Sequence, residues 1–246
     1  HSLPALEKNE RHDIDVVIDR LKVRADAQQR LAESFEAALR AGGADAGGRV
    51  LLADAVDQHA RALMALGVQP GDRLGIWAPN CAEWCITQFA SAKVGAILVN
   101  INPAYRSSEL DYALGQSGCR WVICADAFKT SDYHATLQGL LPGLANGQPG
   151  ALICERFPEL RGVVSLALSP PPGFLAWHAL QARAEAVSGE ALAARQAQLR
   201  CDDPINIQYT SGTTGFPKGA TLSHSNILNN GYMVGESLGL TEHDRL

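Results

Sequence analysis

The 246-residue sequence contains no run of about 18 apolar residues, so it offers no candidate for a membrane-spanning helix. Its first residues, HSLPALEKNERH, lack the apolar core of a secretory signal, and we expect a cytoplasmic protein. The net charge of −5 gives no reason to expect a general attraction to nucleic acid or to an acidic membrane surface. Internal repeats and low-complexity tracts are also missing. The composition is that of an ordinary globular protein.

The six cysteines do not form a metal-binding pattern. No C-x-x-C pair occurs and no histidine stands at zinc-finger spacing, which disfavours a structural zinc site. A chain of this length can bury enough apolar surface without disulfides, so we expect reduced and mostly buried thiols. Cys81 and Cys85 lie one helical turn apart, but core thiols beside Trp84 are a simpler interpretation than a redox or metal pair.

Short apolar strands alternate with helical segments from about residue 55. The pattern predicts helices over 55–68, 81–95 and 107–118, and strands over 72–78, 96–100 and 119–126. Asn80 is a candidate cap for the second helix, and Ser107 or Ser108 for the third. This alternation is typical of βαβ units. The predicted fold class is therefore α/β, with a mainly parallel sheet and flanking helices.

Proline and glycine interrupt the pattern at 141–150 and 169–173, where we expect loops. Two further helices are predicted over 174–186 and 189–199. A strand over 205–209 then leads the chain into a glycine-rich segment.

That segment, YTSGTTGFPKG at 209–219, has the composition of an anion-binding loop. Its glycines let the backbone turn tightly, and its N–H groups and hydroxyls can converge on an anion. Lys218 adds a positive charge suited to phosphate, and Pro217 limits where that lysine can point. The segment is not a Walker A motif, because its lysine follows a proline and precedes a glycine. A short strand and a helix from about Ser223 follow, so we expect the loop to join two strands.

The longer stretch YTSGTTGFPKGATLSHSN resembles the phosphate-binding signature of the adenylate-forming superfamily, which includes acyl-CoA synthetases, peptide-synthetase adenylation domains and luciferases. The stretch ALGVQPGDRLGIWAPNCAEWCITQFASAKVGAILVNINPAYRSSELDYAL is similar to the N-terminal region of fatty acyl-CoA synthetases. The resemblance covers roughly residues 55–246. It implies a partial N-terminal domain of the adenylate-forming fold.

The resemblance also implies an activity. Members of this family join a carboxylic acid, here a fatty acid, to ATP with the help of Mg²⁺, and CoA then displaces AMP. Lys218 would be the catalytic residue of this chain, neutralising charge that moves onto pyrophosphate. The resemblance assigns binding of the β- and γ-phosphates to Thr210, Ser211, Gly212, Thr213, Thr214, Gly215 and Lys218. It leaves the metal ligands unassigned.

Later signatures of the family do not follow Leu246. Missing are the aromatic/His segment of the acyl pocket, the Tyr-Gly-x-Thr-Glu segment, the aspartate for the ribose and the lysine of the small C-terminal domain. We therefore expect a truncated chain that is inactive alone and binds ATP weakly, because such groups act together. Exposed parts of the sheet predict self-association.

Residues 1–54 are expected to form a separate strand-and-helix segment, with a strand over 14–23 and a helix over 25–43. The stretch LPALEKNERHDIDVVIDRLKVRADAQQRLAESFEAALRAGG resembles a segment of the UvrA family, the ATPases of the excinuclease that repairs DNA, from the region that contacts another excinuclease protein. Its charges nearly balance, so we predict no DNA binding. The junction lies between about 47 and 57, and a natural fusion, an engineered chain and an assembly error all remain open.

Two alternatives stand beside the ligase. One is a non-catalytic nucleotide- or phosphate-binding module, and the other is a DNA-repair accessory protein specified by residues 1–50. His224 could approach a nucleotide, but a helix-start residue behind a Ser223 cap is plainer. Arg106 could meet a phosphate of CoA, although an exposed arginine at a helix start is plainer. GESLG, around Ser237, matches a nucleophile elbow but is better interpreted as a helix end.

Overall fold

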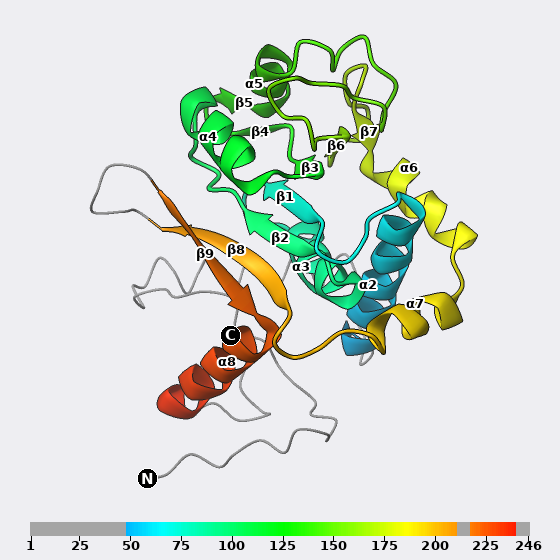
Figure 1. The fold of residues 1–246 in the computed structure, drawn as a ribbon, viewed down its shortest axis with the longest axis vertical. Coiled ribbons are helices and arrows are strands. Elements are labelled where there is room, and N and C mark those ends of the chain that lie inside the picture. Colours follow the sequence, from blue (N-terminus) through cyan, green and yellow to red (C-terminus); the bar gives the residue numbers. More distant parts are fainter. Residues whose placement is uncertain (1–47, 211–216, 240–246) are drawn as a thin grey trace.

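The computed structural model describes residues 48–210 and 217–239. In this part of the chain, a seven-stranded sheet lies between two groups of helices (Figure 1). The strand order is β7-β6-β3-β1-β2-β8-β9, and all neighbours in it run parallel except β8 and β9. The predicted α/β class with a mainly parallel sheet is confirmed. The segments predicted over 14–23 and 25–43 lie outside the described residues.

The helices are α2 (Gly48–Ala65), α3 (Ala82–Val94), α4 (Ser107–Ser117), α5 (Tyr133–Leu140), α6 (Trp177–Ala182), the 3₁₀ turn η1 (Arg183–Ala186), α7 (Gly189–Gln196) and α8 (His224–Leu238). The strands are β1 (Arg73–Trp77), β2 (Ile97–Asn100), β3 (Trp121–Cys124), β6 (Gly162–Ser165), β7 (Leu175–Ala176), β8 (Pro204–Thr210) and β9 (Lys218–Ser223). A separate small hairpin joins β4 (Ala127–Phe128) to β5 (Ser131–Asp132).

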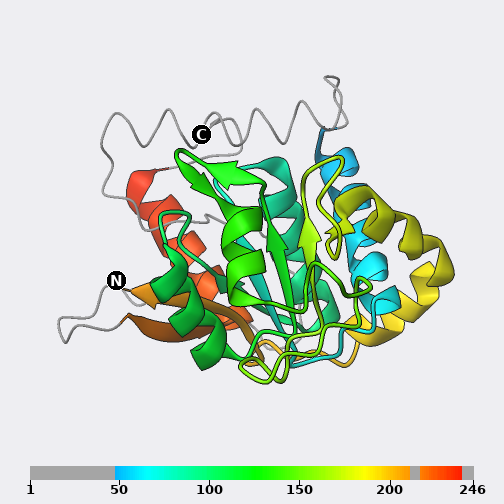
Figure 2. The same ribbon diagram turned by 90° about the horizontal axis from the view of Figure 1, so that it is seen from above.

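Two crossovers put helices on opposite faces of the sheet. The chain runs from β1 through α3 to β2, and then from β2 through α4 back across β1 to β3. Because parallel crossovers are right-handed, connections that travel in opposite directions cover opposite faces. Helix α2 packs against α3, α6 and α7, whereas α5 packs against α4 (Figure 2). The connections that leave β1 and β2 therefore run in opposite directions across the sheet and over opposite faces. Open α/β sheets bind ligands beyond the carboxyl ends of the strands at such a point.

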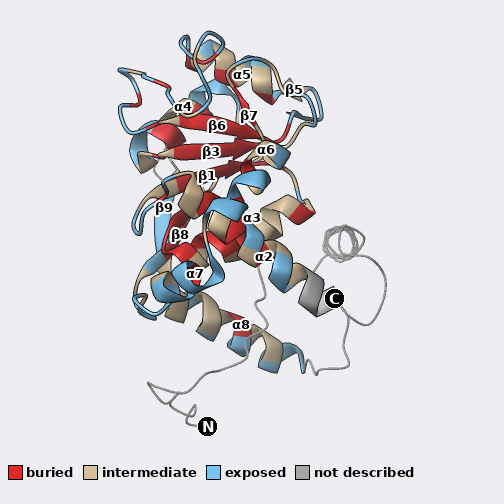
Figure 3. Cartoon of the chain, turned by 90° about the vertical axis from the view of Figure 1, so that its right-hand side faces the viewer, coloured by how far each residue is buried: buried red, intermediate tan, exposed pale blue. Residues whose placement is uncertain are grey.

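The central strands are buried on both faces. In β1, β3 and β6 every residue except Arg73 is buried, and Figure 3 shows these strands in red. Trp77, at the end of β1, stacks on Tyr133 with ring centroids 3.6 Å apart. The indole N–H donates to Asn102 O at 3.1 Å and the Tyr133 hydroxyl donates to Pro103 O at 2.6 Å. Both rings therefore bury apolar surface without leaving a polar group unpaired.

The predicted caps of two helices were wrong. Helix α3 begins after Cys81 and not after Asn80, and Cys81 supplies no side-chain cap. Helix α4 begins after Arg106, so Ser107 is already its first helical residue. The Glu109 carboxylate accepts a hydrogen bond from Arg106 N at 3.0 Å. An acid at this third helical position satisfies the backbone N–H of the preceding residue whatever its side chain, which explains why no serine is needed.

A buried histidine joins three helices on one side of the sheet. His59 of α2 has no exposed surface and stacks on Trp177 of α6, with ring centroids 4.3 Å apart. Its Nδ1 lies 2.7 Å from Gln181 Nε2, and its Nε2 lies 3.5 Å from Thr87 Oγ1. The Thr87 hydroxyl donates to Glu83 O and can accept from the ring N–H. The surroundings therefore suit the neutral imidazole, and burial lowers the pKa of His59 to about 3.

We expect mild acid to destabilise the protein through His59. Its pKa in the folded state lies below its ordinary value of 6.5, so the unfolded chain takes up a proton first. The stability present above pH 6.5 should fall as the pH drops towards 3, by up to about 1.4 kcal/mol per pH unit. Urea unfolding of H59Q between pH 6.5 and 5 should show a flatter dependence than the wild type.

His178 provides the matched control, because this histidine lies exposed on α6. The variant H178Q should keep the wild-type slope of unfolding free energy against pH. Equal slopes in H59Q and H178Q would contradict the role given to His59.

Candidate phosphate-binding site

The glycine-rich loop joins the last two strands of the described sheet, as predicted. Strands β8 and β9 pair antiparallel, with Thr210 opposite Lys218 and Tyr209 opposite Gly219. The Thr210 hydroxyl donates to Lys218 O at 3.4 Å. Five of the predicted phosphate-binding residues, Ser211, Gly212, Thr213, Thr214 and Gly215, lie outside the described residues, and their role stays a prediction. The structure describes the stem of the loop, which we define as Tyr209, Thr210, Pro217 and Lys218.

This stem stands at the carboxyl edge of the sheet. Strand β8 runs parallel to β2, and Gln208 lies opposite Asn100, the last residue of β2. Thr210 therefore extends beyond the carboxyl end of β2, beside the reversal of the chain between β1 and β2. In Figure 1 the hairpin projects from the sheet next to α4. The location agrees with the general position of ligand sites in α/β sheets.

Lys218 is free to meet an anion. Its side chain is exposed, and among the described residues its ammonium has neither a hydrogen-bond nor an ion-pair partner. The next residue, Gly219, lies close to β8: a Cβ atom there would stand 3.0 Å from Ile207 Cγ2. A side chain at this position would force Ile207 to shift by a few tenths of an ångström, so glycine favours the close approach of the two strands. Within 48–210 and 217–239, the arrangement thus presents the Lys218 ammonium without a partner at the exit of the β8–β9 hairpin.

A chain of amide side chains holds β8 in place. Asn206 is fully buried, and its Nδ2 donates to Gln88 Oε1 of α3 at 2.9 Å. Asn100 Nδ2 donates to Asn206 Oδ1 at 3.3 Å. The side-chain oxygen of Asn100 is buried without a partner in the described part of the chain, so it can accept a hydrogen bond from water or a bound molecule. Sequence reasoning missed this network, although asparagines within apolar strand sequences were a signal of it.

Three other candidates from the sequence lie outside the loop stem. His224 follows the cap Ser223, as predicted, and the six steps along β9 from Lys218 separate the two residues by about 20 Å at about 3.3 Å per residue. Ser237 lies inside α8 and donates to Met233 O at 2.7 Å, so the helix-end interpretation of GESLG is confirmed. Arg106 is exposed at the start of α4.

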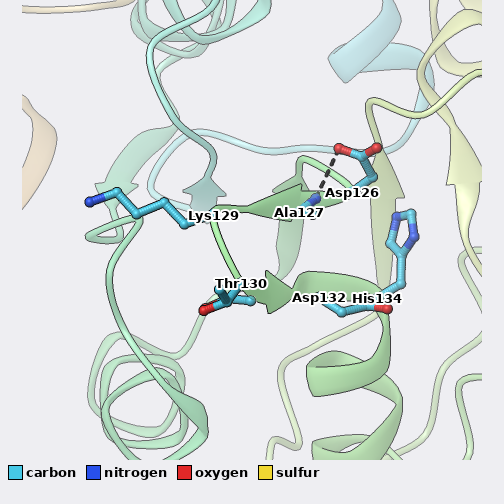
Figure 4. A pocket seen from close by; sticks show the side chains of 7 residues that line it. Asp126, Ala127, Lys129, Thr130, Asp132 and His134 are labelled. Carbon is cyan, nitrogen blue, oxygen red and sulfur yellow. Dashed lines mark hydrogen bonds between the residues drawn. The ribbon is translucent and has the colours of Figure 1, made fainter.

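A polar pocket of about 330 Å³ lies at the carboxyl end of β3, apart from the loop stem (Figure 4). Two carboxylates in its lining already accept hydrogen bonds from backbone N–H groups. Asp126 accepts from Ala127 N at 2.8 Å, and Asp132 caps α5 by accepting from Ala135 N at 2.9 Å. His134 Nε2 lies 2.8 Å from Ser165 Oγ, which ties α5 to the end of β6. The pocket is lined by Asp126, Ala127, Lys129, Thr130, Ser131, Asp132 and His134. These contacts fix the start of α5 and its position against β6, and they give no sign of a reaction.

The described residues do not provide a protein cage for a metal. No group of three His, Cys, Asp or Glu side chains in residues 48–210 and 217–239 is placed to hold an ion. The cysteines are free thiols, but the expectation that most are buried was wrong: Cys119 and Cys124 are buried, Cys201 is exposed, and the other three are half-buried. Burial raises the pKa of the Cys119 thiol to about 11, so it stays protonated at neutral pH. None of the described helices combines the length and the low charge that a membrane crossing requires.

Comparison with known proteins decides the family. The family model described as AMP-binding enzyme matches residues 51–246. The chain belongs to this family. A second model, described as the UvrA interaction domain, matches residues 1–51. Both resemblances inferred from the sequence are thereby confirmed.

Individual relatives give the same result. The mitochondrial medium-chain acyl-CoA ligase of Mus musculus is 46% identical over 187 residues, which make up 76% of this chain and 30% of that protein. Mycobacterium smegmatis MbtA superposes with a TM-score of 0.61 and 24% identity over 79% of this chain and 32% of its own. An anthranilate CoA ligase solved with anthranoyl-AMP gives a TM-score of 0.55 and 26% identity over 71% of this chain and 29% of its own. The described residues thus have the fold of the N-terminal domain of adenylate-forming acyl-CoA ligases.

We expect the amide network to matter for stability. The variant N206A leaves Gln88 Oε1 and Asn100 Nδ2 without partners in a buried place. The free energy of unfolding should fall by about 1–3 kcal/mol in urea titrations followed by tryptophan fluorescence. Gln208 lies two residues further along the same strand, is half-buried and has no side-chain partner among the described residues. The control Q208A should change stability by less than about 0.5 kcal/mol, and equal losses in the two variants would disprove the role of the network.

Proposed function

We propose that this chain forms the phosphate-binding part of an ATP-dependent acid–thiol ligase of the acyl-CoA synthetase type. One observation carries the proposal: Lys218, exposed and without a partner for its ammonium in the part of the chain that the structure describes, lies at the exit of the β8–β9 hairpin, at the carboxyl edge of a parallel sheet. The 46% identity to a ligase named for medium-chain acyl-CoA supports a fatty acid as the carboxylate substrate. The chain spans 30% of the length of that relative, so the assignment concerns the part that handles phosphate.

The reaction has two steps. A carboxylate oxygen attacks the α-phosphorus of ATP, the bond to pyrophosphate breaks, and an acyl-adenylate forms. The thiol of CoA then attacks the acyl carbonyl, loses its proton to solvent, and AMP leaves. Lys218 acts in the first step, where its ammonium stabilises the negative charge that collects on pyrophosphate. Thr210 and the hydroxyls and amides of residues 211–215 would bind the same oxygens.

Magnesium would enter with ATP. A hard cation keeps water and phosphate oxygens as ligands and needs only one or two protein groups, so the lack of an acidic cluster among the described residues does not conflict with its use. None of the described residues is assigned as a ligand of magnesium. Hydroxyl and amide donors around Lys218 suit the phosphate oxygens themselves.

We also propose a boundary between two segments at about residues 54 and 55. The segment 1–54 would carry a different role, because its first 51 residues match the UvrA interaction domain. This match favours, as a second candidate function, an accessory role in DNA repair. Binding of purified excinuclease proteins by the chain, or DNA binding that weakens with salt, would support it. The mouse relative is named as a mitochondrial protein, so the cytoplasm stays a prediction for this chain.

The proposal predicts that K218A weakens phosphate binding. Titration calorimetry of the 246-residue chain with inorganic tripolyphosphate and MgCl₂ should show binding, and K218A should raise the Kd by at least about tenfold, because a charge-assisted contact contributes roughly 1.5–3 kcal/mol. Equal affinity in wild type and K218A would refute the assignment of Lys218. The exposed Lys129 of the β4–β5 hairpin supplies the control, and K129A should leave the Kd within about twofold.

An exchange experiment separates a binding module from a complete ligase. The described residues include no assigned contact to adenine, ribose or the acyl chain, so we expect the 246-residue chain to show no fatty-acid-dependent exchange of pyrophosphate into ATP. Such exchange, if it were lost in K218A, would show that this chain alone completes adenylation. Tripolyphosphate binding without exchange would leave phosphate binding as the activity of this segment.

Self-association through the exposed edge is a further part of the proposal. Among the described strands none pairs with the outer edge of β9, and α8 exposes Tyr232, Met233 and Leu238 to about half of their full area. Unpaired edges and apolar patches of this kind bind other chains. Analytical ultracentrifugation should show a mass that rises with protein concentration, and M233S/L238S should reduce the association. A monomer at every concentration tested would rule it out.

A further inference from the structure

Helix α4 contacts both sides of the loop stem. On the incoming side, the Tyr209 hydroxyl of β8 donates to Ala113 O of α4 at 3.1 Å. On the outgoing side, the Tyr112 hydroxyl of α4 donates to Pro217 O at 3.3 Å. Pro217 immediately precedes Lys218 in the sequence. Two tyrosine hydroxyls on different elements therefore connect one helix to the two ends of the loop.

The hydroxyl of Tyr112 is oriented by its own helix. Gln116, one turn further along α4, donates from Nε2 to the Tyr112 oxygen at 2.9 Å. An oxygen that accepts this bond can direct its proton at the carbonyl of Pro217, and bonds in such a chain strengthen one another. Burial raises the pKa of Tyr209 to about 12, so its hydroxyl remains a donor at neutral pH. The connection from Tyr209 to α4 is therefore present under physiological conditions.

Little else fixes the outgoing side of the stem. Lys218, Gly219, Ala220 and Thr221 are all exposed, so packing does not hold this half of β9. The Thr210 hydroxyl, which donates to Lys218 O at 3.4 Å, belongs to the same exposed hairpin end, and the outer edge of β9 has no strand partner among the described residues. The β8 ladder holds the strand from one side only. A bond from α4 to Pro217 O thus supplies a restraint that the sheet does not.

Helix α4 is a firm base for that restraint. Leu110, Ala113 and Leu114 are buried, which packs the helix into the core. Arg156 forms an ion pair with Asp111, in which Nη2 donates to Oδ2 at 2.6 Å and Nε lies 2.5 Å from Oδ1. A group fixed to an element of this kind keeps its position better than one that depends on a loop.

We infer that Tyr112 is a positioning residue for the phosphate site: by holding the carbonyl of Pro217, it fixes the backbone of Lys218 relative to α4 and so determines where the ammonium meets a polyphosphate. The ring of Pro217 fixes its φ angle, so the position of its carbonyl constrains the next residue closely. The inference rests on the proposed function of Lys218. It assigns the recognition of polyphosphate partly to a helix that is not adjacent to the loop in sequence.

The first test removes the hydroxyl of Tyr112 alone. In calorimetric titration of the 246-residue chain with tripolyphosphate and MgCl₂, Y112F should raise the Kd by about fivefold, the effect of losing a bond of about 1 kcal/mol. Tyr133 is the matched control, since its hydroxyl also donates to a backbone carbonyl, Pro103 O, at 2.6 Å. Y133F should cost at least as much free energy of unfolding but leave the Kd within about twofold. Equal changes of Kd in Y112F and Y133F would show a general structural effect and overturn the inference.

The second test needs no ligand. Hydrogen–deuterium exchange followed by mass spectrometry should show exchange in the peptide covering 217–223 about fivefold faster in Y112F than in wild type, with the peptide covering 162–166 unchanged. Unchanged exchange at 217–223 in Y112F would overturn the inference even if the chain bound no polyphosphate.

The two proposals fail in different ways. Equal affinity in wild type and K218A would refute the phosphate role of Lys218, and the anchoring of the stem would still be measured by exchange. Loss of affinity in K218A together with wild-type affinity and exchange in Y112F would refute the positioning role alone.

Discussion

The parallel pairing of β8 with β2 is the contact on which the candidate site depends. It carries Thr210 past the carboxyl end of β2, beside the point where the chain reverses direction between β1 and β2. Asn206, buried in β8, fixes this strand laterally through Gln88 of α3 and Asn100 of β2. A shift of the register by one residue would turn these amides to the opposite face and leave them unpaired. The network therefore specifies the position of β8, and β8 sets the position of the loop.

Burial declines from the centre of the sheet to the hairpin. Strands β1, β3 and β6 are covered on both faces, whereas four of the six residues of β9 are exposed (Figure 3). Removing apolar area from water stabilises the centre, at about 25 cal/mol per Å², but supplies little at the edge. Hydrogen bonds must hold the hairpin instead. This explains why polar contacts from α3 and α4 are concentrated on β8 and on the end of the loop.

The sequence predicted the elements of the sheet better than the contacts between them. Strands near 72–78, 96–100 and 119–126 were found because parallel strands buried on both faces are continuous apolar runs. The hairpin at the loop was also predicted, since its glycines and proline exclude a regular element. The cap of α4 was missed because Glu109 satisfies the backbone N–H that a capping residue leaves free, and α3 begins after Cys81 without any side-chain cap. The bond from Tyr112 to Pro217 joins residues 105 positions apart, and local pattern contains no information on such a partner.

The contact between Tyr112 and Pro217, which are far apart in sequence, also bears on how the site works. The loop supplies a cation and donors that any small shift of the backbone would displace from phosphate oxygens, and electrostatic stabilisation requires donors fixed before charge develops. Glycines in such a loop allow close approach of the backbone to a ligand. Helix α4 restrains the described stem on both sides of the loop, through Tyr209 on the incoming side and Pro217 on the outgoing side. One helix therefore sets the position of both described ends of the loop.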